Sequence, residues 1–223
     1  MDWEFIGSVL PEYLRAAGLT FGLGGLEVVL SLICGLVCAL VRYWQLPLLS
    51  QVVGIYIELS RNTPLLIQLF FLYYALPKLG ITWPSTVCAL VGLTFLGSSY
   101  MAEAFRSGLE AVPKSQLEGA YSLALSRRQC FRYVVLPQAL ASSIPALMTN
   151  VIFLIKETSM FSIVALADLM YVAKEHIGLY YKTDEALFLL VLAYTALLLP
   201  LSLLGHVLER RLHHGQFGHR HPL

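Results

Sequence analysis

Residues 103–139 read EAFRSGLEAVPKSQLEGAYSLALSRRQCFRYVVLPQA, and this polar stretch decides how the rest of the chain is interpreted. It lies between two segments that are apolar enough to cross a lipid bilayer. A basic, helix-forming insert of about 30 residues is longer than a simple connection between two membrane helices requires. We therefore predict that it forms a folded docking surface for a soluble partner.

The composition of the chain indicates that most of its surroundings are lipid. Hydrophobic residues make up 57% of the 223 residues, and charged residues make up only 13%. A chain with so few charges cannot cover itself with a solvated surface, which excludes an ordinary soluble globular domain. The four cysteines lack a disulfide pattern and are better explained by packing than by metal binding, so we predict no metal site.

The apolar segments predict an all-α membrane protein with one domain, residues 1–223. A helix needs about 20 apolar residues to cross the hydrocarbon core of a bilayer. The second segment contains Glu58, Arg61 and Pro64, so we expect a broken or kinked element there. Residues 1–14 are predicted to form an interfacial amphipathic helix. The five predicted spans are residues 18–41, 48–76, 85–102, 137–155 and 186–207.

The distribution of Lys and Arg predicts the orientation in the membrane. Loops on the cytoplasmic side carry an excess of these residues. Five spans place the termini on opposite sides, so we expect the N-terminus outside and the loop 107–136 and the tail 210–223 inside. The cytoplasmic set comprises Arg42, Arg106, Lys114, Arg127, Arg128, Arg132, Arg210, Arg211 and Arg220, against Arg15, Lys78, Lys174 and Lys182 outside.

The loop 107–136 is predicted to form a helix, a bend and a second helix. Pro113 suits the first position of a helix, and residues 118–125 favour helix. Ser126 is a candidate interruption, and a second short helix is expected over residues 127–135, before Pro137. Short helices of this kind need something to pack against.

The same loop resembles the EAA loop of ATP-binding-cassette (ABC) importer permeases. That pattern reads Glu-Ala-Ala, three residues, Gly, nine residues, Ile, any residue, Leu-Pro, and the spacing here matches it fully. The matching residues are Glu118-Gly119-Ala120, then Ala124, then Val134-Val135-Leu136-Pro137. The chain departs from the pattern at Gly119, Ala124 and Val134, where the family usually has Ala, Gly and Ile.

Three further segments resemble the polar amino-acid branch of that family. Arg61-Asn62-Thr63-Pro64-Leu65-Leu66-Ile67-Gln68 is similar to its Arg-Gly-Thr-Pro-Leu-Leu-x-Gln segment, with Asn62 in place of Gly. The segments 100–106 and 156–159 also resemble that branch, and the second more often reads Lys-Asp-Thr-Ser there. The resemblance covers nearly the whole chain, with four motifs in the same order.

The resemblance implies a permease subunit of an ATP-driven importer for polar amino acids in the bacterial inner membrane. Two permease chains, identical or homologous, would form the pathway, and a dimer of cytoplasmic ATPase subunits would bind ATP and Mg. An extracytoplasmic solute-binding protein would deliver the amino acid, and no nucleic acid is involved. The chain itself is expected to be non-catalytic and without cofactor, since residues 22–25 are glycine-rich but lack the Lys-Ser or Lys-Thr of a phosphate-binding loop.

The resemblance also assigns candidate residues for coupling to the ATPase. We expect docking through the segment 118–125, and Arg127, Arg128 and Arg132 are explained equally well by ATPase contact or by positive-inside anchoring. The predicted coupling residues are Glu118, Gly119, Ala120, Tyr121, Ala124 and Leu125.

Candidate residues for the substrate pathway are polar groups at membrane depth. Such groups are costly there and usually face a cavity or a partner. Glu157 is suited either to an amino acid's ammonium group or to structural pairing, and Asn150 lies two helical turns before it on the same face. Arg61 suits a carboxylate, although a structural role is favoured. The full set is Glu157, Asn150, Gln68, Ser98, Ser99 and Arg61.

Two other classes of function fit part of the pattern. A small transporter or channel driven by an ion gradient would use Glu157 and Lys156 as a relay, and a membrane scaffold would recruit a partner through the loop. The outer loop 168–185 suits either a landing surface for the binding protein or a solvated connector. The His-rich tail is explained better by solvation than by metal binding. The sequence does not identify the amino acid.

Overall fold

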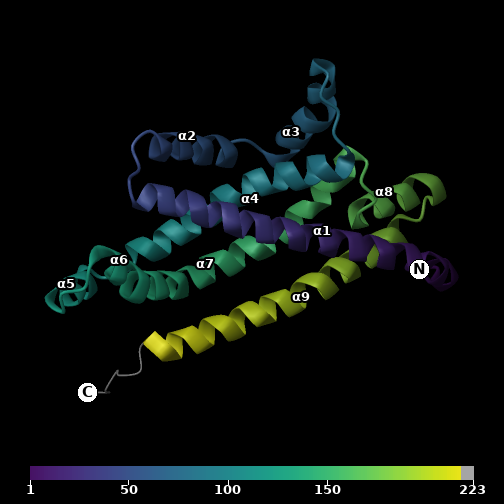
Figure 1. The fold of residues 1–223 in the computed structure, drawn as a ribbon. Helices are drawn as coiled ribbons and strands as arrows, with labels where there is room; N and C mark the ends of the chain where they lie inside the picture. Colours follow the sequence, from purple (N-terminus) through teal and green to yellow (C-terminus); the bar gives the residue numbers. More distant parts are fainter. Residues whose placement is uncertain (217–223) are drawn as a thin grey trace.

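The structure is a computed structural model that describes residues 1–216, and all regular elements within that range are helical (Figure 1). The N-terminus and the C-terminal end of α9 lie at opposite ends of the molecule, and α5 and α6 lie at the end away from the N-terminus. The helices are α1 (Trp3–Tyr43), α2 (Leu49–Arg61), α3 (Leu65–Phe70), α4 (Ser85–Glu110), α5 (Lys114–Ser122), α6 (Arg127–Cys130), α7 (Leu136–Glu157), α8 (Leu169–Tyr180) and α9 (Thr183–Gln216).

Four helices are long and apolar enough to cross a membrane, and a shorter apolar helical segment accompanies them. The four are Trp3–Tyr43, Ser85–Glu110, Arg127–Val164 and Thr183–Arg210, and the shorter one is Leu65–Leu79. These segments confirm the predicted all-α membrane fold. The predicted span 48–76 differs, because α2 is separate from α3 and neither piece alone has the length of a full span.

The expected break in the second segment falls at Asn62–Pro64. Proline disfavours the helical conformation of the residue before it and has no N–H for the helix ladder, so α2 ends and α3 starts anew. Gln68 Nε2 donates to the carbonyls of Ser60 at 3.1 Å and Thr63 at 2.9 Å. This amide therefore satisfies carbonyls that the end of α2 leaves without a helical partner.

The predicted interfacial helix 1–14 and the span 18–41 form a single helix, α1. No break separates them, because residues 14–18 contain no strong helix-stopping signal and the helix continues through Arg15, Ala16 and Ala17. Asp2 caps the start of α1, its side chain accepting from the N–H of Phe5 at 3.1 Å.

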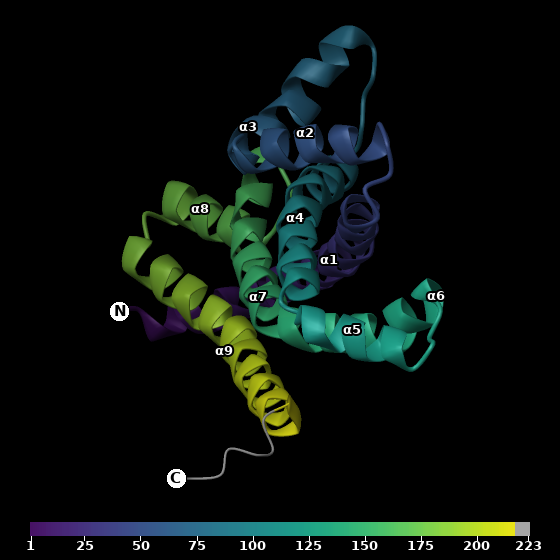
Figure 2. The same cartoon turned by 90° about the vertical axis from the view of Figure 1, so that its left-hand side faces the viewer.

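Helix α4 lies at the centre of the bundle, between α1 and α7 (Figure 2). Glycines allow α1 and α4 to approach closely. A Cβ added at Gly35 would lie 2.5 Å from Met101 Cβ and 2.9 Å from the backbone nitrogen of Ala102. A Cβ at Gly97 would meet Ser31 and the carboxylate of Glu27, which is fully buried. This interface is therefore closed to larger side chains.

The helices that contain the third and fourth predicted spans extend beyond those spans into the predicted loop 107–136. Helix α4 continues to Glu110, and the third membrane-length helix, which contains the fourth predicted span, begins at Arg127. A π-helical turn, Phe131–Val135, connects α6 with α7 just before Pro137. The altered hydrogen-bond spacing of such a turn lets the helix continue into a proline, which supplies no N–H.

Helix α9 includes the predicted span 186–207 and continues to Gln216. The predicted tail 210–223 thus begins as helix, and residues 217–223, with His219 and His221, lie outside the described residues.

Candidate functional site

The polar loop contains the predicted helix, bend and helix. Helix α5 follows Pro113, and a four-residue bend, Leu123–Ser126, leads to α6. Ser126 and Gln129 form a capping box, in which Gln129 Oε1 accepts from the N–H of Ser126 at 2.9 Å. Capping boxes satisfy N–H groups that the first turn of a helix leaves free. The local sequence therefore defines where the second helix begins.

The bend is built on Ala124, whose φ of 57° is left-handed. The N–H of Ala124 donates to the carbonyl of Tyr121 at 2.9 Å, and that of Leu125 donates to the carbonyl of Ala120 at 3.2 Å. This pair of hydrogen bonds is a Schellman motif, whose left-handed position normally holds glycine. The bend thus forms at the position where the EAA pattern has Gly, although alanine has a steric cost there.

The six predicted coupling residues divide between two faces of the loop. Ala120 is buried and Leu125 is half-buried, and both pack on the chain's own hydrophobic core. Four are exposed: Glu118, Gly119, Tyr121 and Ala124. Leu123 lies within the predicted docking segment 118–125 but outside the six named residues; it is 77% exposed and is the C-cap of α5. An apolar side chain at a bend within a polar stretch is the sequence signal for such a position.

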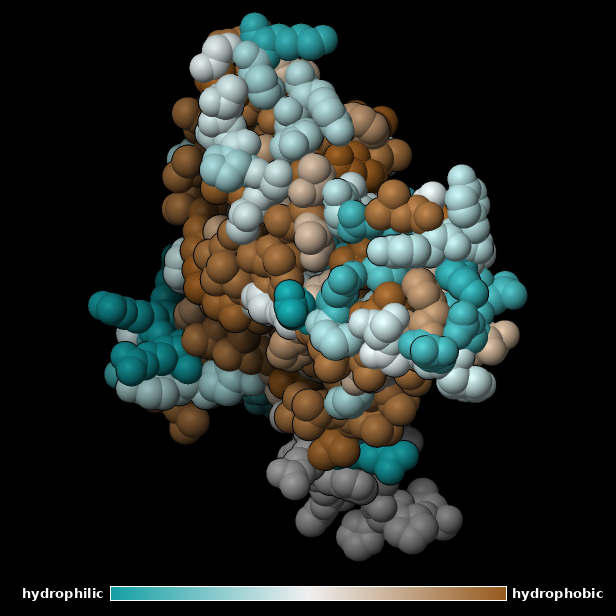
Figure 3. Space-filling view, turned by 90° about the vertical axis from the view of Figure 1, so that its right-hand side faces the viewer, coloured by the Kyte–Doolittle hydropathy of each residue, from teal (hydrophilic) through white to brown (hydrophobic). Residues whose placement is uncertain are grey.

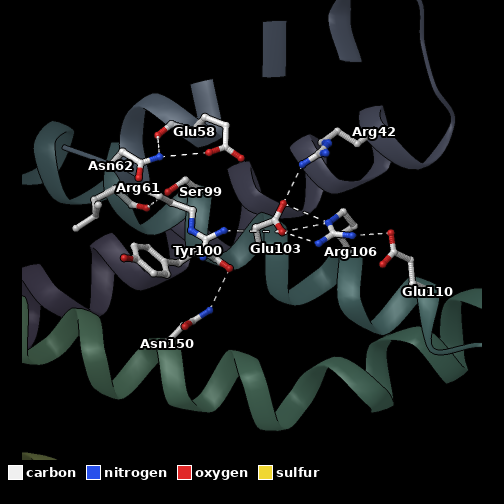
Figure 4. A network of polar contacts seen from close by, with 11 residues as sticks. Arg42, Glu58, Arg61, Asn62, Ser99, Tyr100, Glu103, Arg106, Glu110 and Asn150 are labelled. Atoms are coloured by element: carbon white, nitrogen blue, oxygen red, sulfur yellow. Dashed lines mark hydrogen bonds and ion pairs between the residues drawn. The ribbon is translucent and has the colours of Figure 1, made fainter. Parts of the chain in front are cut away.

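Three of the predicted pathway residues gather around Tyr100 (Figure 4). The guanidinium of Arg61 lies over the Tyr100 ring, 5.2 Å from its centroid, and Asn150 Nδ2 donates to the Tyr100 carbonyl at 3.0 Å. Ser99 is buried beside Tyr100, and its hydroxyl donates to the carbonyl of Leu96 at 2.6 Å. The network joins α2, α4 and α7 and is held by polar contacts.

Glu103 continues this network as the acceptor for three arginines from different helices (Figure 4). Its carboxylate lies 2.8 Å from Arg42 Nη1, 2.7 Å from Arg106 Nη2 and 3.9 Å from Arg61 Nη1. Arg106 also pairs with Glu110 at 2.6 Å. Residues 100–106 stood out in the sequence as a motif, but only the fold shows that Arg42 and Arg61 converge on Glu103.

The other three predicted pathway residues lie apart from Tyr100. Gln68 uses its amide to cap α2, and its Oε1 atom is buried without a hydrogen-bond partner among the described residues. Ser98 is buried and its carbonyl oxygen faces Gly35 of α1. Glu157 is half-buried at the end of α7. The predicted set therefore divides between one network and three separate positions, and its role in transport stays a prediction.

Clustered metal ligands are absent from the described part of the chain: no group of three or more His, Cys, Asp or Glu side chains there is placed to hold an ion.

The structure is a bundle of membrane-length helices with an exposed, capped helix pair at one end, an architecture that suits a membrane subunit of a larger complex. Residues 31–214 match the family described as binding-protein-dependent transport system inner membrane component. The chain belongs to this family and is a permease subunit of an ABC importer.

Amino-acid ABC transporter permeases align with nearly the full length of this chain. A probable glutamine ABC transporter permease of Bacillus subtilis (strain 168) is 35% identical over 217 residues, covering 93% of this chain and 99% of that protein. An L-cystine transport system permease of the same organism is 34% identical, covering 95% and 92%. A crystal structure of an amino acid ABC transporter with histidines has a TM-score of 0.89 at 31% identity, covering 95% and 99%.

Family membership settles several predictions made from the sequence. The chain is a multi-pass inner-membrane protein and a non-catalytic subunit that works with a separate ATPase and a permease partner. The alternatives of a gradient-driven transporter or channel and of a recruiting scaffold are therefore set aside. The inward-facing methionine ABC transporter, at 20% identity and a TM-score of 0.78, supports the fold alone.

Proposed function

We propose that this chain forms, with a second permease chain, the pathway of an importer for a polar amino acid. The observation that carries the proposal is the Schellman-capped α5, whose outer face exposes Glu118, Tyr121 and Leu123 at one end of the bundle. The glutamine, cystine and other amino-acid permeases among its relatives support the substrate class.

Helix α5 is the element that receives the ATPase. A helix of nine residues is marginal alone, and exposed Tyr and Leu side chains suit a cleft in a partner better than water. The ATPase subunits bind ATP and Mg, and their closure moves α5. Because α5 connects through short segments to α4 and, through α6, to α7, its movement reaches both membrane-length helices as rigid elements.

The opposite end of the molecule is the outer surface, with the N-terminus outside. Polar side chains gather around the N-terminus and α8, beside apolar flanks (Figure 3). Lys182 pairs with Asp2 at 2.9 Å, and His176 contacts Glu12 at 2.8 Å, so α1, α8 and the start of α9 are tied together. A surface fixed in this way suits a solute-binding protein that delivers the amino acid.

Different residues serve ATPase coupling and the substrate pathway in this proposal. Glu118, Gly119, Tyr121 and Ala124 contact the ATPase, and Ala120 and Leu125 hold α5 against the bundle. Arg61, Asn150 and Ser99 shape the pathway near Tyr100, and Gln68, Ser98 and Glu157 act at other points along it.

The experiment is reconstitution of the permease with its ATPase, its binding protein and a panel of amino acids in proteoliposomes. Glu118→Arg is expected to lower ATPase co-purification and coupled uptake by about tenfold, since a reversed charge at an interface costs on the order of 1–2 kcal/mol. Glu4→Arg, an exposed carboxylate at the other end, is the matched control and should leave co-purification unchanged. Normal coupling in Glu118→Arg removes this residue from the interface, and uptake without any ATPase overturns the proposal.

A further inference from the structure

A polar pocket of about 330 Å³ lies between the C-terminal ends of α1 and α4. Arg42 of α1 and Arg106 of α4 both reach it, and each side chain is half-buried (Figure 4). The pocket contains none of the residues assigned above to ATPase coupling or to the substrate pathway, so the proposed function leaves it without a role. Its lining consists of Arg42, Tyr43, Gln45, Arg106, Leu109 and Glu110, and it is called the Arg42 pocket below.

The ion pairs beside the Arg42 pocket leave positive charge without a partner. Three arginines converge on Glu103, and one of them, Arg106, also pairs with Glu110. Three guanidinium groups against two carboxylates leave one net positive charge in this network. Within residues 1–216, Arg42 makes one side-chain hydrogen bond, from Nη1 to Glu103 at 2.8 Å. Its remaining N–H groups are therefore available to an anion, and a planar guanidinium binds phosphate oxygens in pairs.

The turn that leaves α1 beside the Arg42 pocket is apolar. Residues 43–57 include no charged side chain. The rings of Tyr43 and Trp44 contact the Phe131 ring, with centroids 5.5 Å and 5.4 Å away, which holds the turn in place. Exposed aromatic and apolar side chains beside arginines are typical of the boundary between lipid headgroups and acyl chains. The large apolar side chains exposed on this turn and at the start of α2 include Trp44, Leu46, Leu48 and Leu49.

We propose that the Arg42 pocket binds the phosphate of one anionic phospholipid, whose acyl chains lie against the exposed apolar turn. Basic pockets between membrane helices are a known form of headgroup site. The free N–H groups of Arg42 donate to the phosphate oxygens, and the Gln45 amide donates to the headgroup. One phosphodiester carries one negative charge, which neutralises the charge that the ion pairs leave over.

The apolar turn favours a lipid over other anions. A free phosphate or an acidic patch on the ATPase would meet the arginines equally well, but neither would cover the exposed leucines and Trp44. The inference goes beyond the proposed function and takes from it only the orientation, which places the Arg42 pocket at the cytoplasmic leaflet.

Tryptophan quenching by brominated lipids tests the site. Trp3→Phe with Trp83→Phe leaves Trp44 as the only tryptophan of the chain. This protein is purified in mixed micelles that contain phosphatidylglycerol or phosphatidylcholine with brominated acyl chains. At equal mole fraction, phosphatidylglycerol should be preferred at Trp44 by at least about fivefold, the factor expected for one unit charge beside an anionic headgroup. The matched reporter keeps only Trp3, at the other end of α1, and should distinguish the two lipids by less than about twofold.

Charge changes at Gln45 test the pocket without breaking an ion pair. Gln45 is exposed and lines the pocket. Gln45→Glu should lower the preference for phosphatidylglycerol by about fivefold, and Gln45→Lys should raise it by about the same factor. Arg42→Gln should lower the preference by at least as much as Gln45→Glu. Arg15→Gln removes an exposed cation near the other end of α1 and should leave the preference unchanged. Size-exclusion chromatography checks that each variant is folded and monodisperse.

Four outcomes overturn the lipid site. Equal quenching of Trp44 by the two lipids in the parent excludes selection of an anionic headgroup. Full relief of quenching by glycerol 3-phosphate or inorganic phosphate assigns the pocket to a free phosphate. An unchanged preference in both Gln45 variants excludes the Arg42 pocket as the source of the selection. Loss of ATPase co-purification in Gln45→Glu, with its lipid preference unchanged, assigns the pocket to the ATPase interface.

Failure of the proposed function is seen separately. Lipid selection is measured on the purified chain without ATPase or binding protein, and uptake is measured in proteoliposomes. Selection of phosphatidylglycerol at Trp44 in a chain that supports no amino-acid uptake would contradict the proposed function alone.

Discussion

The α1–α4 interface and α5 differ in how tightly they pack within this chain. Between α1 and α4, Gly35 and Gly97 bring the backbones so close that no added Cβ fits, and Met101 is completely buried. In α5 only Ala120 is buried, and a Cβ added at Gly119 meets nothing within 4 Å. The first region is stabilised by packing within this chain, and the second, in the proposed function, packs against a partner. Mutations should therefore act on folding in the first and on coupling in the second.

The most severe test of this contrast is Gly35→Leu. A leucine there meets Met101 and the backbone of Ala102, so we expect a loss of more than about 4 kcal/mol or no folded protein, since overpacking against backbone is relieved only by separating the helices. Thermal unfolding in detergent, followed by size-exclusion chromatography, measures the loss. Gly22→Leu lies exposed on the same helix with open space around it and should unfold within about 0.5 kcal/mol of the parent. Equal behaviour of the two variants would contradict the close-packing account.

Glu103→Ala should have the next largest effect, a loss of about 2 kcal/mol. It leaves Arg42, Arg61 and Arg106 without their shared acceptor, and the loss is moderate because the three guanidinium groups are partly exposed and screened by solvent. Glu110→Ala breaks one exposed pair with Arg106 and should cost less than about 1 kcal/mol. Chemical unfolding of both variants in mixed micelles gives the comparison, and similar losses would show that Glu103 is not the centre of the network.

Asp168 should make stability depend on pH. It caps α8 between the third and fourth membrane-length helices, and burial raises the pKa of its carboxyl to about 6. Hydrogen bonds from the cap and Lys174 act in the opposite direction on this pKa. Because this pKa in the folded state exceeds the carboxyl's ordinary value of 3.8, the folded state binds more protons than the unfolded state between about pH 4 and pH 6. Stability then falls as pH rises from about 4 to about 6, by up to about 2 kcal/mol.

The variant Asp168→Asn keeps a capping oxygen and removes this titration. The difference in unfolding free energy between parent and variant should therefore change with pH, favouring the parent most at low pH. Unfolding curves at pH 4.5 and 6.5 measure it, and a difference that is constant between the two pH values would exclude Asp168 as the source.

The smallest effect concerns α5 itself. Ala124→Gly relieves the left-handed strain at the bend and should stabilise α5 by about 1 kcal/mol. Gly119→Ala fills open space in the helix interior and should add about the same amount. Hydrogen exchange of α5 amides in the isolated permease should slow about fivefold in each variant, while exchange at the α1–α4 interface stays unchanged. A global change in exchange would mean that α5 is not locally independent.

Sequence patterns predicted the elements that depend on local chemistry. The lengths of the apolar segments predicted the long helices, and Pro64 predicted the break between α2 and α3. The spacing of the EAA motif predicted the helix pair and its bend. Helix ends were less predictable from apolar length: nothing in residues 14–18 stops α1, and the Ser126 capping box begins a helix ten residues before the predicted fourth span. The meeting of Arg42, Arg61 and Arg106 at Glu103 was not predictable, because residues far apart in sequence converge only once the bundle forms.

Gln68 stiffens the break between α2 and α3. Its amide is fastened to carbonyls on both α2 and the connecting segment, so the interruption is braced instead of free to swivel. If α2 tilts, α3 and the helical turns that follow it up to Leu79 must then move with it as one rigid arm. Removing this brace would uncouple the two ends of the arm without breaking either helix.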